Sequence, residues 1–69
     1  MNNETNTDTF EIFNEGFADA TGSTLSEARD SWAWYSRQLS DSERNQIEAR
    51  GSDAGWAEGN RYCLDKNFL

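Results

Sequence analysis

The 69-residue sequence contains no histidine, no proline and no valine, and Cys63 is its single cysteine. Histidine is the side chain that most often serves as a general base near neutral pH, so its absence argues against an enzyme. One cysteine cannot form an intramolecular disulfide, and a free thiol is typical of a reducing compartment. The sequence also lacks an apolar run of roughly 18 residues and an apolar signal-peptide core. These absences predict a soluble, cytoplasmic, non-enzymatic protein.

Basic residues are also scarce. Six Lys and Arg stand against 13 Asp and Glu, and none precedes Arg29. Residues 1–22 therefore carry a charge of −5 and residues 23–69 a charge of −2. Direct binding to nucleic acid or anionic lipid needs clustered cations, so we expect neither. An acidic surface of this kind fits a basic protein partner, and its simpler interpretation is that it keeps the chain soluble.

The acidic residues of the N-terminal region recur every three or four positions: Glu4, Asp8, Glu11, Glu15 and Asp19. On a helix these five carboxylates would fall in a sector of about 80°. Phe10, Phe13 and Phe17 would lie on roughly the opposite side of the same helix. The pattern predicts a helix that presents carboxylates to a partner or to solvent and aromatic rings to the core.

Three potential N-cap residues each stand three positions before a Glu: Asp8 before Glu11, Thr24 before Glu27, and Ser40 before Glu43. This spacing is typical of a capping box, in which side chains accept from the unpaired amides of a helix start. It predicts helices over residues 9–20, 25–38 and 41–50. Gly22 and Gly51 follow the first and third of these helices, where a glycine commonly ends a helix.

The remaining segment admits two interpretations. One is a fourth helix over residues 54–67, and the other is a short helical turn followed by an extended tail over residues 62–69. Gly55 and Gly59 weaken the helical interpretation. We expect an all-α fold, a small bundle of three helices plus a C-terminal helical segment. It would form a single domain over residues 8–69, preceded by a polar arm over residues 1–7.

The predicted core is thin, and its members recur at helical spacing: Phe10, Phe13, Phe17, Leu25, Ala28, Trp32, Tyr35, Leu39 and Ile47. In a fourth helix, a broad shared face would consist of Trp56, Asn60, Cys63, Leu64, Asn67 and Phe68. Gly16 lies beside the aromatic face of the first helix, where it would allow another backbone to approach closely. A chain this small commonly needs a disulfide, a metal or a partner subunit. With neither cysteine pairs nor histidine available, a homodimer or stabilisation on a target is expected.

The sequence holds no recognisable catalytic, metal-binding or cofactor-binding motif. Cys63 is expected to be a small buried apolar residue, because no histidine can activate its thiol. Gly55 and Gly59 do not form a phosphate-binding loop. Asp41 and Glu43 are better explained as part of a helix start than as calcium ligands. We therefore expect no catalytic residues, no metal and no cofactor.

Trp34 is the second unusual residue. On the helix expected over residues 25–38 it would lie about 160° from Trp32, on a face shared with Glu27, Asp30 and Arg37. Two interpretations remain open. Either the fourth helix or a second subunit covers Trp34, or it is an exposed aromatic anchor for another protein, a role in which tryptophan is common.

In composition, the chain resembles phage-encoded inhibitors of host defence such as anti-restriction and anti-CRISPR proteins, which are small, acidic and helical. This resemblance implies a non-enzymatic protein that occupies a basic surface of a partner protein, such as a surface that binds nucleic acid. The partner-binding residues would be Glu4, Asp8, Glu11, Glu15, Asp19, Asp30 and Trp34. The alternative is a small structural or assembly subunit that oligomerises through its aromatic residues.

Overall fold

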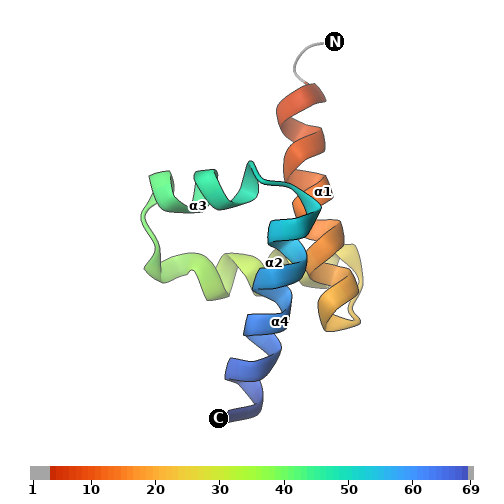
Figure 1. Ribbon diagram of the computed structural model, residues 1–69, viewed down its shortest axis with the longest axis vertical. Helices are drawn as coiled ribbons and strands as arrows, with labels where there is room; N and C mark the ends of the chain where they lie inside the picture. The colour runs from red at the N-terminus through yellow and green to blue at the C-terminus, as the bar shows by residue number, and fades with distance from the viewer. Residues whose placement is uncertain (1–3, 69) are drawn as a thin grey trace.

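The computed structural model describes the backbone of residues 4–68 and the side chains of residues 9–66. It confirms the all-α fold. The described residues form four α-helices, α1 (Glu4–Thr21), α2 (Leu25–Tyr35), α3 (Asp41–Glu48) and α4 (Ser52–Phe68), and one 3-10 turn, η1 (Ser36–Gln38). Figure 1 shows α1 and α4 along the long axis, with α2 and α3 projecting to one side. The molecule is elongated and measures 42 × 25 × 18 Å.

The starts of α2 and α3 are the complete capping boxes that the sequence predicts. The Glu27 amide donates to Thr24 Oγ1 over 3.1 Å, and the Thr24 amide donates to Glu27 Oε1 over 3.0 Å. Ser40 and Glu43 form the same reciprocal pair at 3.1 and 2.9 Å. Each box pairs amides that the first helical turn would otherwise leave without an acceptor.

The start of α1 differs from the prediction. The helix begins at Glu4, so the backbone of Asp8 lies inside it, and the predicted start at residue 9 is wrong. Residues 4–7, expected in a polar arm, belong to the same helix. The side chains of Glu4 and Asp8 lie outside the described residues.

The helix ends follow local backbone chemistry. Gly22 and Gly51 adopt φ values of +70° and +82°, a left-handed conformation that glycine reaches without strain. The predicted helix over residues 25–38 stops earlier, at Tyr35. The Ser36 amide donates to the carbonyls of Trp32 and Trp34, and η1 then leads into the extended residue Leu39. This tightening turns the chain so that α3 can fold back over α2.

Glycine allows α1 and α4 to pack closely side by side, running in the same direction (Figure 1). A methyl group at Gly59 would lie 2.7 Å from Ala20 Cβ and 2.9 Å from the Phe17 carbonyl oxygen. One at Gly16 would lie 3.0 Å from the Trp56 amide nitrogen, as the sequence suggested for a close backbone approach. Gly59 therefore does not weaken the case for α4 but lets it touch α1, which decides for the helical interpretation of this segment.

The core is centred on aromatic rings between α1 and α2. Phe13 and Phe17 are fully buried, and Trp32 is 2% exposed. The ring centroids of Phe13 and Trp32 lie 4.8 Å apart, and those of Phe17 and Tyr62 lie 5.6 Å apart. Ala28 is also buried as predicted. These rings supply most of the apolar area that a chain of this size can bury.

Other residues predicted for the core are only partly buried. Leu25, Tyr35, Leu39 and Ile47 are of intermediate exposure. Phe10 is 37% exposed, so its predicted burial is wrong. It lies beyond the end of the α1–α4 contact, where it borders a shallow cavity with residues of α3 rather than a closed core. Phe10 therefore lies at the margin of the core.

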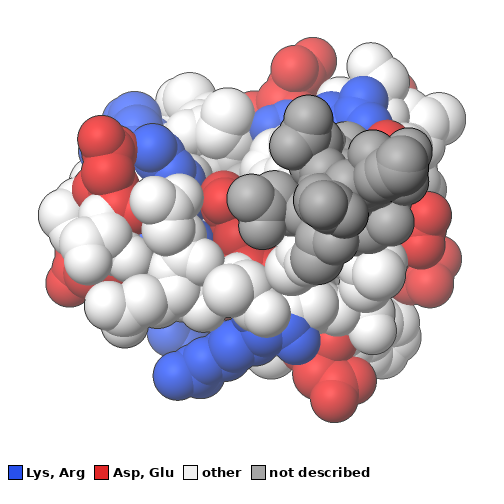
Figure 2. Space-filling view, turned by 90° about the horizontal axis from the view of Figure 1, so that it is seen from above, with Lys and Arg blue, Asp and Glu red and all other residues white. Residues whose placement is uncertain are grey.

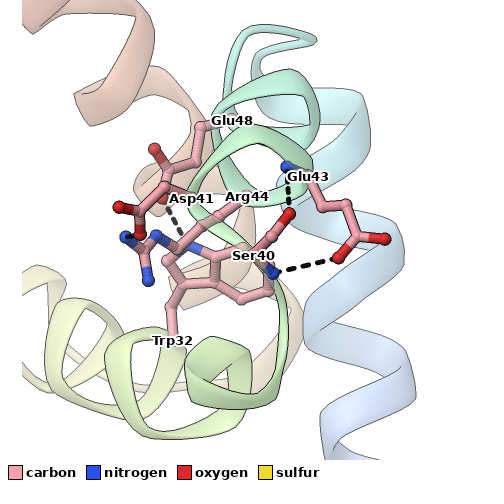
Figure 3. Close-up of polar contacts among 6 residues, drawn as sticks. All are labelled: Trp32, Ser40, Asp41, Glu43, Arg44 and Glu48. Atoms are coloured by element: carbon pink, nitrogen blue, oxygen red, sulfur yellow. Dashed lines mark hydrogen bonds and ion pairs between the residues drawn. The ribbon is translucent and has the colours of Figure 1, made fainter.

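Polar contacts complete the attachment of α3. The buried indole N–H of Trp32 donates to Glu48 Oε2 over 2.7 Å, linking α2 to the end of α3 (Figure 3). Arg44 and Asp41 form an ion pair of 2.7 Å within α3.

Asn14, unexpectedly, is fully buried. Its Nδ2 donates to the Phe10 carbonyl over 2.9 Å, while its Oδ1 has no partner among the described residues.

Candidate functional site

The predicted acidic stripe is divided by the fold. Glu11 forms an ion pair with Arg29 of α2, with Oε2 and Nη2 2.5 Å apart, so it is not free for a partner. Glu15 and Asp19 are exposed as predicted, and neither has an ionic partner among the described side chains. Of the three stripe residues whose side chains are described, Glu15 and Asp19 are the two without an ion pair; the side chains of Glu4 and Asp8 lie outside the described residues.

The α1–α4 contact brings an aromatic residue beside these carboxylates. The backbone of Trp56 lies against Gly16, which is the residue after Glu15 and three residues before Asp19 on α1. The Trp56 side chain is 52% exposed. Ile12, one turn before Gly16 on α1, is 43% exposed, and its Cγ2 would be 3.7 Å from a methyl group at Gly51.

We call this surface the outer face; it consists of Ile12, Glu15, Asp19, Asp53 and Trp56. None of these five residues is a cation, and the exposed Arg50 directly precedes Gly51, which lies beside Ile12. The sequence of α1 has no Lys or Arg, and the cations of α4 lie toward α2. Arg61 borders a cavity beside Trp32, and Lys66 lies 5.6 Å from the centre of the Tyr62 ring.

The sequence predicted a broad face of the fourth helix that Trp56 shares with Leu64, and the packing of α4 on α1 uses another face. Gly55, Gly59 and Tyr62 contact the rest of the protein, whereas Leu64 is 67% exposed. Hydrophobicity alone does not identify the face of α4 that packs on α1, because this contact depends on small residues. The signal that could have found it is the matching four-residue spacing of Gly16 with Ala20 and of Gly55 with Gly59.

Trp34 and Asp30 do not join the outer face. Both lie on α2, where Asp30 is exposed and Trp34 is 55% exposed. The fourth helix therefore does not bury Trp34. Instead the Arg37 guanidinium stacks 4.1 Å above the Trp34 ring, and Arg37 Nη1 donates to the Trp34 carbonyl over 2.9 Å.

A groove of about 420 Å³ separates Trp34 from the C-terminal half of α4. Trp34, Tyr35 and Tyr62 form its aromatic walls, and Arg37, Asp65 and Lys66 supply its charges. The Tyr35 hydroxyl donates a short hydrogen bond to Asp65 Oδ2. Burial, and then this hydrogen bond and the negative charge of Asp65, raise the pKa of Tyr35 to about 12. Tyr35 therefore stays a neutral donor throughout the physiological range.

The charges are interspersed where α1 begins. Figure 2 views the molecule from that end and shows carboxylates at separate places, with basic side chains between them. Among the residues drawn in colour, no continuous acidic patch covers this end. The carboxylates drawn in colour therefore form no duplex-like array of negative charge in this view.

Chemical groups for catalysis are not brought together in the described part of the chain. Cys63 is partly buried, with its Sγ 3.9 Å from the Ala20 carbonyl oxygen, which it contacts as a weak donor. Within the described residues, no three Cys, Asp or Glu side chains are grouped as metal ligands. What the arrangement offers is surfaces for binding.

Comparison with known proteins gives no further guide. No match to the chain was found among protein-family models, curated proteins or solved structures. Among the described residues, no helix combines the length and apolar character needed to cross a bilayer.

Proposed function

We propose that this chain is a non-enzymatic binding protein whose outer face engages a basic surface of a partner protein in the cytoplasm. The observation that carries the proposal is the pair of exposed carboxylates, Glu15 and Asp19, which have no ion pair among the described side chains and flank the point of α1 that the half-exposed Trp56 contacts. Exposed acidic residues of this kind accelerate association with a basic partner.

Charge alone would give a weak contact, because isolated ion pairs at a surface contribute only about 0–1 kcal/mol. The apolar groups of the outer face supply the remaining component. Trp56 and Ile12 are 52% and 43% exposed, and burying them against a partner would remove apolar area from water. Tryptophan is also the residue type most enriched among interface residues that dominate affinity. The proposed interface therefore has an aromatic centre with acidic groups around it.

The charge spacing limits what the outer face can imitate. Glu15 and Asp19 are four residues apart on α1, a rise of about 6 Å. Measured along the helix axis, one DNA strand carries one phosphate per about 3.4 Å. The face is thus better matched to a few Lys or Arg side chains than to a whole nucleic-acid channel. We propose that the partner's basic surface is one that normally holds nucleic acid, so that the protein acts as a competitive inhibitor of the phage type.

The deciding experiment is capture of partners from host lysate by the immobilised full chain, at low and high salt, with mass spectrometry of the eluted proteins. Candidates are then purified and their affinities measured for the parent and for the variant Glu15→Lys with Asp19→Lys. The expected result is a loss of affinity of at least a hundredfold at low salt, mainly through slower association. DNA and RNA should compete with the parent for the same partner.

A matched control separates the local effect from the total charge. Asp30→Lys with Glu58→Lys changes the net charge by the same amount, and neither residue belongs to the outer face. This control should bind within a few-fold of the parent. If both double variants lose affinity equally, general charge rather than the outer face governs binding, and the proposed site is wrong.

A second candidate is an assembly subunit that associates with itself through aromatic residues. It is favoured by one observation, that Trp34 and Trp56 each remain about half exposed, at 55% and 52%, in a chain with a small core. Sedimentation of the parent and of Trp56→Ala over a range of protein concentration distinguishes the candidates. A dimer that resists high salt and dissociates in Trp56→Ala would favour the assembly subunit, because an aromatic self-interface is little screened by salt.

A further inference from the structure

The groove beside Trp34 lies on a different face from the carboxylates of α1 and has different chemistry. We propose that it is a binding site for a small planar aromatic carboxylate, with the ligand ring between Trp34 and Tyr62 and its carboxylate at Arg37 and Lys66. Its volume of about 420 Å³ falls in the range of small-molecule sites.

The walls of the groove are held in place before any ligand arrives. Arg37 stacks on Trp34 and donates to its carbonyl oxygen, which restrains both side chains. The Tyr35 hydroxyl donates a hydrogen bond to Asp65, and the Tyr35 ring packs edge-on against Tyr62, with ring centroids 5.3 Å apart. A site whose walls are already ordered loses less entropy on binding, so a flat ring can enter at low cost.

The charges of the groove select for an anion. Arg37 and Lys66 both border it, and neither forms an ion pair with another described side chain. The one acid in the groove, Asp65, already accepts the hydrogen bond of Tyr35. A carboxylate on the ligand would satisfy two cations at once, and a guanidinium is well shaped to bind a carboxylate with two hydrogen bonds. A cationic ligand would instead be repelled by the positive charges of Arg37 and Lys66.

The test is a titration of the isotope-labelled full chain with indoleacetate, followed by the nuclear magnetic resonance signal of the Trp34 indole N–H. Neutral indole-ethanol and cationic tryptamine serve as probes with the same ring. Indoleacetate should bind at least tenfold more tightly than indole-ethanol, and tryptamine more weakly than either. Equal affinity for the acid and the alcohol would overturn the proposal.

Variants assign the selectivity to its residues. Arg37→Gln with Lys66→Gln should remove the preference for the acid but keep binding of the alcohol, while Arg50→Gln, an exposed cation outside the groove, should change neither. Trp34→Ala should abolish binding of both probes; because Trp34 is outside the core, a preserved thermal melt confirms its fold. If Arg37→Gln with Lys66→Gln retains the preference, the proposal fails.

A final arm separates a free small molecule from a protein terminus. A short peptide that ends in tryptophan with a free carboxylate presents the same groups as indoleacetate. If it binds tenfold more tightly than indoleacetate, the occupant is a peptide and the small-molecule assignment is wrong. The outcome of this arm is independent of Glu15 and Asp19, so it stands apart from the proposed partner-binding function.

Discussion

The α1–α4 pair and the α2–η1–α3 segment are stabilised by opposite kinds of interaction. The first depends on residues far apart in sequence, because Gly16, Gly55 and Gly59 let two helical backbones meet. The second depends on neighbours, because Thr24 with Glu27 and Ser40 with Glu43 fix each helix start within four residues. The α2–η1–α3 segment, the local half, can therefore be predicted from neighbouring residues in the sequence. The α1–α4 pair, which forms the outer face, becomes evident only when the packing of distant residues is known.

The largest expected effect comes from filling the α1–α4 contact. In Gly55→Ala, the added methyl group would lie 2.9 Å from the Phe13 carbonyl carbon and 3.0 Å from the Phe17 amide nitrogen. The backbone of α1 can make room for this methyl group only if α1 and α4 move apart. Because domains have only about 0.05–0.15 kcal/mol of stability per residue, we expect loss of the cooperative thermal melt measured by circular dichroism.

Gly22→Ala is the matched control for that substitution. A methyl group at Gly22 would meet nothing within 4 Å, and only its positive φ of +70° opposes alanine. The expected cost is about 1–2 kcal/mol, so this variant should still fold with a lower melting temperature. If Gly55→Ala is no worse than Gly22→Ala, close packing of α1 on α4 is not what holds the pair together.

A smaller effect is expected from the contact between the two halves made by Tyr35 and Asp65. Because the pKa of Tyr35 is raised from 10.0 to about 12, the folded state holds this proton more tightly than the unfolded state does. Its contribution to stability is therefore complete below pH 10 and is lost as the pH rises toward 12.

Tyrosinate absorbance of the parent should show one phenol that ionises late, and Tyr35→Phe should remove it. Chemical denaturation at several alkaline pH values should show a stability loss in the same window that is missing in Tyr35→Phe. A parent in which Tyr35 ionises near pH 10 would exclude a folded Tyr35–Asp65 contact.

The capping boxes give a third effect, confined to the local half. Ser40→Ala removes the oxygen that accepts from the Glu43 amide and should cost about 1 kcal/mol in the free energy of unfolding. Thr24→Ala should cost a similar amount at the start of α2. Urea denaturation of both variants checks the values. A cost near zero at Ser40 would mean that the Trp32–Glu48 hydrogen bond alone positions α3.

The sequence predicted most where structure is encoded locally. The helix class and the starts of α2 and α3 followed from cap residues, and the buried Phe13, Phe17 and Trp32 followed from apolar spacing. It failed at Phe10 and at the start of α1, where neighbouring elements rather than the helix's own residues decide exposure and length. It did not identify the face of α4 that packs on α1, because a contact made by glycine leaves no hydrophobic signal.

The candidate site was predictable in part. Exposure of Glu15 and Asp19 followed from their spacing opposite the phenylalanines. Asp30 and Trp34 lie exposed on α2 rather than on α1, and Trp34 borders the groove, so their part in a partner-binding surface stays a prediction. Trp56 was missed as a surface residue, because its neighbours on the outer face come from a helix about forty residues earlier, and no local pattern records that pairing.

The smallest expected effect concerns Glu11, a stripe residue whose ion pair with Arg29 joins the two halves. Glu11 pairs with Arg29 at a partly exposed position, where ion pairs contribute about 0.2–1 kcal/mol. Glu11→Gln should therefore lower the free energy of unfolding by no more than that amount, and the loss should shrink at high salt. Glu15→Gln, which breaks no ion pair within the described residues, should leave stability unchanged or slightly raised, because it relieves repulsion from Asp19. Urea denaturation at low and high salt measures the stability of both variants. Partner affinity should show the opposite ranking, with Glu15→Gln losing more affinity than Glu11→Gln. If Glu11→Gln weakens partner binding more than Glu15→Gln does, the carboxylate held by Arg29 is part of the interface, and the outer face must be extended toward α2.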